Sequence, residues 1–245
     1  MPYEGCILGY FTVWQGPENN VCDSLNIQKR NEVLIGWSKD GFHWNRENKK
    51  PFLPVSEDFH AWNAGNVQST AGSPLIVGDS LYFYVSGRYN SKPKHDSNFA
   101  TGLAMLRRDG FVSMRAGRKE GYVEIKTQIP ANGNYLFVNA DVKGTLAVEV
   151  LDDNGQPMEG FTKKDCISMK KSDKTKQMIS WEKHPGVTSL VGKTVRLKFY
   201  LNQADIYAFW ISAWQTGESG GYTGGGGPGL SDKGIDTTMD KLKNN

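Results

Sequence analysis

Short apolar or alternating runs recur along the whole chain, and each run is closed by Gly, Asn, Asp or Pro. This pattern is typical of β-strands joined by turns, and helical periodicity is almost absent. Tight-turn signals at residues 77–80 and 153–155 favour hairpins and antiparallel sheets. The chain is therefore predicted to be all-β. Strands are predicted over 6–14, 32–38, 73–77, 80–86, 102–107, 121–126, 135–140, 145–151, 177–181, 194–201 and 206–213.

The pattern changes near residue 118, after which apolar and polar positions alternate more regularly. Residues 195–201, for example, are apolar on one side and basic or polar on the other. One apolar and one wet face per sheet favours an antiparallel β-sandwich over 118–215. Residues 216–245 are rich in glycine and offer little to bury, so we predict a disordered tail.

A short motif appears twice in the first half of the chain. Asp40-Gly41-Phe42 and Asp109-Gly110-Phe111 each follow a predicted strand and two polar residues. One turn signature per unit is typical of a propeller or another repeat architecture. We expect the side chains of Asp40, Asp79 and Asp109 to cap the backbone of their turns.

Composition and charge narrow the function classes. The chain has 245 residues, of which 38% are hydrophobic and 22% charged, which is typical of one large or two ordinary globular domains. A net charge of +3 gives no reason to expect nucleic acid, and no run reaches the ~20 apolar residues that would indicate a membrane partner. We interpret the lysine-rich stretch 163–176 as a solvated loop.

Signals for metal, cofactor and nucleophilic chemistry are missing. The four histidines lack metal-ligand spacing, there is no CxxC pair, and phosphate-loop and Gly-x-Ser-x-Gly motifs are absent. We therefore expect neither a metal nor another cofactor. Cys6 and Cys22 fit either a disulfide or two buried thiols, and the thiols are favoured.

Aromatic residues make up 11% of the chain, and many lie beside Gly, Asn or Asp. Sugar sites use this mixture, because a flat ring covers the C–H face of a pyranose while polar neighbours bond its hydroxyl groups. The alternative is that β proteins are rich in aromatic residues for packing reasons.

The segment from Ser38 to Arg46 resembles the S-x-D-G-x-x-W-x-R strand-turn of five-bladed β-propeller glycosidases, the clan of invertase-like and arabinosidase-like enzymes. The resemblance extends over residues 1–215. Over this range the chain resembles a bacterial group of these proteins that has a C-terminal β-sandwich. Its further segments are 51–54, 78–84, 101–104, 108–111, 136–141 and 148–152.

This resemblance implies a propeller with catalytic carboxylates at its axis. Residues 1–117 would form about two closing blades, so the first carboxylates would lie upstream and the chain would be N-terminally truncated. Glu4 would be the general acid at the start of an inner strand; the alternative is an ordinary strand-edge carboxylate. The remaining expected substrate-binding residues are His60, Trp62, Asn63, Gln68 and Arg88. Asn63 stands where the group often has Asp, and this loop could instead be a linker packed by its aromatic residues.

Three functions follow as expectations. The first is the C-terminal part of a glycoside hydrolase acting on poly- or oligosaccharides, inactive alone and extracytoplasmic or secreted, although this chain shows no signal peptide. The second is a non-catalytic carbohydrate-binding module. The third is a structural module whose unpaired strand edges recruit a partner chain or the missing N-terminal blades. For carbohydrate binding by the sandwich, the candidates are Tyr207, Phe209, Trp210 and Trp214.

Overall fold

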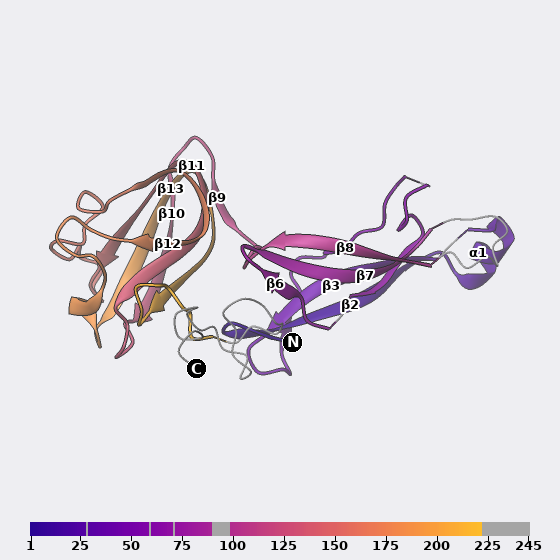
Figure 1. Cartoon of the computed structure of the whole chain (residues 1–245), viewed down its shortest axis with the longest axis horizontal. Helices are drawn as coiled ribbons and strands as arrows, with labels where there is room; N and C mark the ends of the chain where they lie inside the picture. The colour runs from indigo at the N-terminus through magenta and orange to yellow at the C-terminus, as the bar shows by residue number, and fades with distance from the viewer. Residues whose placement is uncertain (28, 59, 71, 90–98, 222–245) are drawn as a thin grey trace. The chain divides into compact units, whose positions relative to one another are not determined.

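The computed structural model describes residues 1–27, 29–58, 60–70, 72–89 and 99–221. Most of these residues lie in strands of two hydrogen-bonded sheets (Figure 1), which confirms the all-β prediction. The helical segments in the described ranges are α1 (Asn19–Leu25) and a 3₁₀ turn (Thr188–Leu190). The chain divides into two compact units, one containing residues 1–106 and Gly221, the other residues 107–220.

The first unit is built on one eight-stranded sheet with two halves. In one half, β1 to β4 form a meander in which each strand pairs with the next. In the other half, β5, β6 and β8 all pair with β7. A single parallel pair, Asn31 with Asn66, joins β3 to β5 and thereby links the halves. The strands are β1 (Pro2–Tyr3), β2 (Cys6–Gly16), β3 (Arg30–Ser38), β4 (Trp44–Asn45), β5 (Asn66–Thr70), β6 (Leu75–Val77), β7 (Ser80–Arg88) and β8 (Phe99–Arg107).

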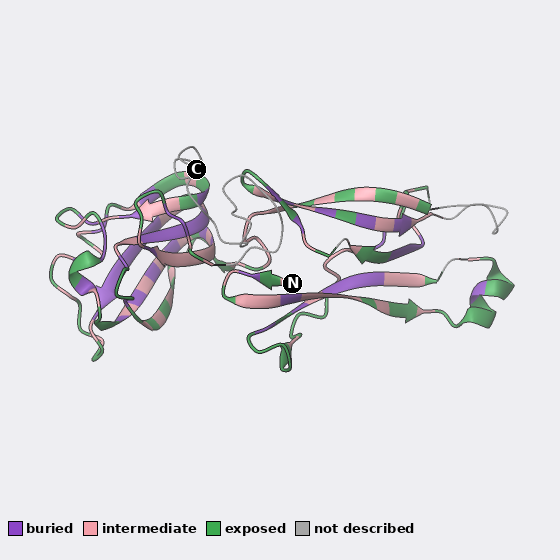
Figure 2. Ribbon diagram, turned by 60° about the horizontal axis from the view of Figure 1, so that its bottom comes forward, coloured by how far each residue is buried: buried purple, intermediate pink, exposed green. Residues whose placement is uncertain are grey.

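The two halves of this sheet share an aromatic core. The Tyr10 ring of β2 stacks on the Phe52 ring, with 5.7 Å between the ring centroids. Both rings pack edge-to-face with Phe83 on β7, at centroid distances of 5.8 and 5.5 Å. Buried and part-exposed residues alternate along β7, as Figure 2 shows, because successive side chains of a strand point to opposite faces. The buried face of β7 therefore packs against the first half of the sheet.

Both predicted tight turns are present. Val77 pairs with Ser80, so β6 and β7 form a two-residue hairpin in which Gly78 has a φ of 58°. In the second unit, the backbone N–H of Gly155 donates to the carbonyl of Asp152 at 3.0 Å, and Gly155 has a φ of 83°. Glycine takes these left-handed angles at little cost, which is why the sequence signal was reliable.

The repeated Asp-Gly-Phe motif forms two different turns. In the first copy Gly41 has the positive φ, 80°, and the turn connects β3 to β4 in one sheet. In the second copy Asp109 has the positive φ, 58°, and the chain continues from β8 in the first sheet to β9 in the second. The motif therefore does not by itself mark two equivalent structural repeats.

The second unit contains one five-stranded antiparallel sheet in the order β10-β13-β11-β12, with β9 also paired to β13. The sequence predicted two strands in each of the segments that form β11 and β13, but each is one continuous strand. The strands are β9 (Met114–Ala116), β10 (Gly121–Gln128), β11 (Tyr135–Leu151), β12 (Met169–Ile179) and β13 (Thr194–Ser212).

Bulges explain why the two long strands look interrupted in sequence. The β11–β13 register shifts between Val142 and Thr145, where Gly144 lies against β13; a Cβ on Gly144 would be 2.4 Å from the carbonyl oxygen of Asn202. Gln203, across from it, has a φ of 43°. A bulge bends a strand without ending it, so one sheet curls around its own core.

The core of the second unit lies on one face of this bent sheet. On β11 it takes every second residue from Leu136 to Val142, and then Leu146, Ala147, Val148 and Val150. Trp181 is almost fully buried in the same core, and its Nε1–H donates to the carbonyl of Val148 at 3.0 Å. The unit therefore has a complete hydrophobic core of its own.

The lysine-rich stretch 163–176 was predicted as a loop, and that prediction is wrong for its second half. Lys170, Lys171, Lys174 and Lys176 lie on β12, which pairs only with β11 in the described sheet, and all four are exposed. Lysine on an edge strand discourages pairing with another chain, so an edge strand can have the composition of a loop.

The first residues of the predicted tail are part of the second unit or lie directly after it. Residues 216–221 are described, and the indole N–H of Trp210 donates to the carbonyl of Gly217 at 3.0 Å. Residues 222–245 lie outside the described residues. Cys6, Cys22 and Cys166 are free thiols, as favoured for the first two, but Cys22 is buried whereas Cys6 is only partly buried.

Candidate functional site

A groove of about 460 Å³ lies on the first unit, where strands of the two sheet halves approach each other. Its lining combines an indole, a phenol, hydroxyl groups and one amide side chain, and it contains no carboxylate side chain. The lining residues are Met1, Ile7, Leu8, Gly9, Tyr10, Thr12, Val33, Trp44, Gln68, Ser69, Thr70 and Gly72.

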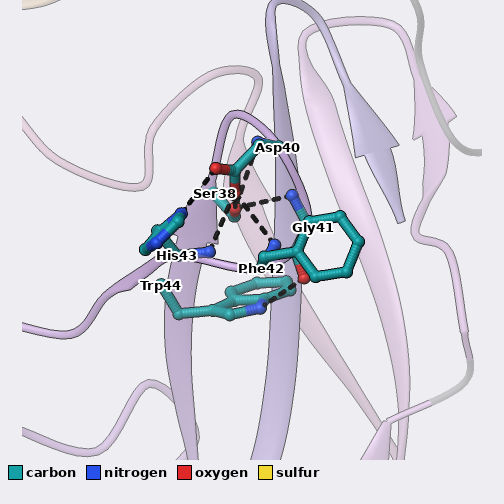
Figure 3. A network of polar contacts seen from close by, with 6 residues as sticks. All are labelled: Ser38, Asp40, Gly41, Phe42, His43 and Trp44. Atoms are coloured by element: carbon teal, nitrogen blue, oxygen red, sulfur yellow. Dashed lines mark hydrogen bonds and ion pairs between the residues drawn. The ribbon is translucent and has the colours of Figure 1, made fainter.

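The Asp40 turn directly precedes Trp44 and is held by a network of polar contacts (Figure 3). The Asp40 carboxylate accepts the backbone N–H groups of Phe42 at 2.9 Å and His43 at 2.8 Å, and its second oxygen lies 2.7 Å from Nδ1 of His43. The contact with His43 and the two backbone N–H groups hold the pKa of Asp40 well below its usual value. This confirms that Asp40 caps its turn.

Trp44 follows directly and forms one wall of the groove. Its indole N–H donates to the carbonyl of Gly41 at 3.0 Å, which fixes the ring relative to the turn. The ring lies against Gly9 of β2, where a Cβ would be only 2.6 Å from the nearest ring atom. Trp44 remains 40% exposed. One part of the ring is thus supported by backbone while another part is open to a ligand.

A β-bulge places Gln68 on the opposite side of the groove. Val67 pairs with Gly87 and Ser69 with Ser86, so Gln68 is the extra residue of β5. The bulge removes Gln68 from the regular ladder and lets it contact a different strand.

Two contacts then hold Gln68. The hydroxyl of Thr12 on β2 donates to its carbonyl oxygen. Nη2 of Arg88 donates to its side-chain Oε1 at 2.9 Å. The guanidinium of Arg88 lies over the ring of Phe99, 4.2 Å from its centroid. Gln68 and Arg88 are thus in contact, but of these two only Gln68 lines the groove.

The other expected binding residues belong to the loop between β4 and β5. The Trp62 ring covers Gly87 and Gly102, where Cβ atoms would each lie 2.3 Å from it, and Trp62 is 39% exposed. The backbone N–H of His60 donates to the Asp58 carboxylate at 3.0 Å, and the Asn63 amide donates to the Pro54 carbonyl at 3.3 Å. These three residues do not line the groove.

Glu4 lies in the turn between β1 and β2, with a φ of 49°, and not at the start of an inner strand. A Cβ placed on Gly221 would be 2.1 Å from the Glu4 carboxylate, so this carboxylate lies beside the backbone of Gly221. Glu4 does not line the groove.

The aromatic candidates of the second unit mostly serve packing. Phe209 packs on Phe199 at 5.1 Å, and Trp210 stacks on Phe137 at 5.6 Å. Tyr207 lies under the guanidinium of Arg107 at 5.0 Å. Trp214 is the most open of the four, with 40% of its surface exposed.

Sequence reasoning missed most of the groove, above all Tyr10, Thr12, Trp44, Ser69 and Thr70. One signal was present: a glycine inside a strand often marks close approach of another group, and Gly9 occurs inside β2. The sequence does not say that Trp44 is the group that approaches.

Comparison with protein-family models, curated proteins and solved structures gives no match to this chain. Among the described residues, no group of three or more His, Cys, Asp or Glu side chains is placed to hold a metal ion. Within the same ranges, no helix is both long and apolar enough to span a bilayer.

Proposed function

We propose that this chain binds carbohydrate in the groove of its first unit. The observation that carries this proposal is the half-open Trp44 ring, which is backed by Gly9 and faces a groove that also holds Thr12, Gln68, Ser69 and Thr70. An aromatic face suits the C–H face of a pyranose, and hydroxyl and amide groups suit its hydroxyls. A mixed lining with a few polar groups that fix orientation is usual for small-ligand sites.

The groove favours binding over hydrolysis by this chain alone. Glycoside hydrolysis generally requires two carboxyl groups on either side of the scissile bond. The groove lining has none, and Glu4 lies elsewhere in a turn. If the chain is part of a propeller glycosidase, as the Ser38–Arg46 segment suggests, the catalytic carboxylates come from outside the groove described here.

The resemblance also supports a finer proposal for the fold and its location. We take the meander β1 to β4 and the group β5 to β8 as two propeller blades, and the curled second sheet as a derived β-sandwich. An invertase-like protein of this kind would act outside the cytoplasm on poly- or oligosaccharides.

A glycan array carrying neutral and acidic plant and algal oligosaccharides tests the proposal. We expect the full chain to bind at least one class of glycan, and Trp44→Ala to lower the affinity at least about fivefold, because an aromatic contact is worth about 1 kcal/mol beyond its buried area. Trp14→Ala is the matched control: Trp14 lies on β2, is 51% exposed and does not line the groove. Absence of binding to every glycan, or equal losses in the two variants, would overturn the proposal.

A parallel assay separates binding from catalysis. The full chain is incubated with aryl-glycosides and with the oligosaccharides that it binds, and products are followed by chromatography. We expect binding without turnover. Robust hydrolysis would contradict the assignment of the groove as a non-catalytic site.

A further inference from the structure

The groove presents two polar groups whose hydrogen-bonding roles are already fixed by their neighbours. We infer that Gln68 and Thr12 are the specificity-determining residues of the groove, and that together they bind two neighbouring hydroxyl groups of a neutral sugar. Arg88 is a positioning residue for Gln68. This inference rests on the proposed carbohydrate-binding function and names the part of the ligand that the groove selects.

Thr12 presents a hydrogen-bond acceptor to a ligand. Its hydroxyl has one hydrogen, which it donates to the backbone carbonyl of Gln68. That carbonyl is available because Gln68 is the extra residue of the β5 bulge. Since the hydrogen is committed, the hydroxyl oxygen of Thr12 can only accept a hydrogen bond from a ligand.

Gln68 presents its amide nitrogen to a ligand. A guanidinium has donors and no acceptor, so Arg88 must bond the amide oxygen of Gln68 and not the nitrogen. The amide –NH2 group, with two donors, is therefore the part of the side chain left for a ligand. Gln68 is exposed and lines the groove, whereas Arg88 does not.

Arg88 is itself held in place by a neighbouring ring. Its guanidinium stacks over the Phe99 ring at 4.2 Å. Among the residues that the structure describes, no carboxylate lies within ion-pair distance of Arg88. No described acid therefore competes with Gln68 for this guanidinium, and the orientation of the amide is maintained.

Among the polar groups of the groove, Gln68 thus offers a donor and Thr12 an acceptor, and both residues are held by hydrogen bonds of their own. Sugars carry adjacent hydroxyl groups, each of which can accept or donate. One ligand hydroxyl would accept from the Gln68 amide, and its neighbour would donate to the Thr12 oxygen. The Trp44 ring in the same groove supplies the apolar surface for the sugar ring.

Gln68→Glu is the decisive variant, measured by titration calorimetry of the full chain with xylohexaose, cellohexaose and arabinohexaose. The new carboxylate keeps the shape of Gln68 and pairs with Arg88, so we expect the melting temperature to stay the same or rise. It cannot donate to the ligand, so we expect affinity to fall about tenfold. A merely structural role for Gln68 predicts no loss of affinity in a stable variant.

Matched variants separate the contributions. Gln128→Glu makes the same charge change at an exposed site on β10 and should leave affinity unchanged. Thr12→Val lacks the hydroxyl group and should weaken binding severalfold. Thr12→Ser keeps the hydroxyl group and should retain the affinity of the unmodified chain. Arg88→Met should weaken binding, whereas Arg88→Lys keeps a donor for Gln68 and should retain most of it.

The results distinguish this inference from the proposed function. If Trp44→Ala lowers affinity but Gln68→Glu binds as the unmodified chain does, the inference is wrong and the proposed function stands. If the unmodified chain binds none of the three hexaoses and no glycan on the array, both are wrong.

Discussion

At the scale of single residues, glycines help to position two of the exposed tryptophans, Trp44 and Trp62. The Trp44 ring rests on Gly9, and the Trp62 ring rests on Gly87 and Gly102. Each ring replaces a side chain that the glycine lacks, in the way an aromatic residue rescues a glycine in a designed sheet. The same arrangement keeps part of each ring open to solvent.

Gly87→Ala should destabilise the first unit by about 1–3 kcal/mol, because the added methyl group would overlap the Trp62 ring in a packed position. A Cβ at Gly87 would be 2.3 Å from that ring, whereas nothing lies within 4 Å of a Cβ at Gly5. Thermal unfolding of Gly87→Ala and of the control Gly5→Ala tests this. Equal melting temperatures would show that Trp62 does not occupy this position.

Asp40 is one of the residues that contribute to the pH dependence of stability. Folding lowers the pKa of Asp40 through its contact with His43 and the backbone N–H groups of His43 and Phe42. A lowered pKa gives stability that is present above the unfolded-state value of about 3.9 and is lost as the pH falls toward the folded-state value. The unmodified chain should therefore lose stability on acidification below about pH 4.

Asp40→Asn should flatten that loss, since the amide has no carboxyl proton to gain. Denaturant unfolding between pH 6 and pH 2 measures the difference between the two chains. If both lose stability in parallel over this range, the Asp40 contacts do not form in solution.

At the scale of elements, the sequence located most long strands but not the irregularities that shape the site. Alternation of apolar and polar residues is a local signal, so β2, β3, β7 and β10 could be predicted. The bulge at Gln68 depends on which strand pairs with β5, and that pairing brings together residues far apart in the sequence. For the same reason the sequence could suggest Trp62 and Gln68 as separate candidates. It could not show that, of these two, only Gln68 lines the groove.

The edge strand β12 provides a test at this scale. Lys174→Val should change the free energy of unfolding by no more than about 0.5 kcal/mol, because the side chain is exposed. It should raise self-association severalfold, because it removes a charge from the edge strand. Light scattering at several concentrations measures this. Lys183→Val, in an exposed loop, is the control, and equal association of the two variants would contradict the edge-strand account.

At the scale of the whole molecule, the chain contains two units with separate cores. The core of the second unit draws all its residues from within residues 107–220. A segment with a complete core of this kind should fold when it is expressed alone. A fragment of residues 107–220 should therefore unfold cooperatively and show a near-ultraviolet dichroism signal from the buried Trp181. A non-cooperative transition would show that the division into units is wrong.

The central claim is that a sugar binds against Trp44 in the groove of the first unit. The most direct measurement is an NMR titration of the indole N–H signals of the seven tryptophans with xylohexaose, cellohexaose and arabinohexaose. The account predicts that the Trp44 signal, assigned through Trp44→Phe, shifts saturably with one of these sugars while the Trp14 signal stays in place. A Trp44 signal that does not move, while binding is detected elsewhere or not at all, would contradict it.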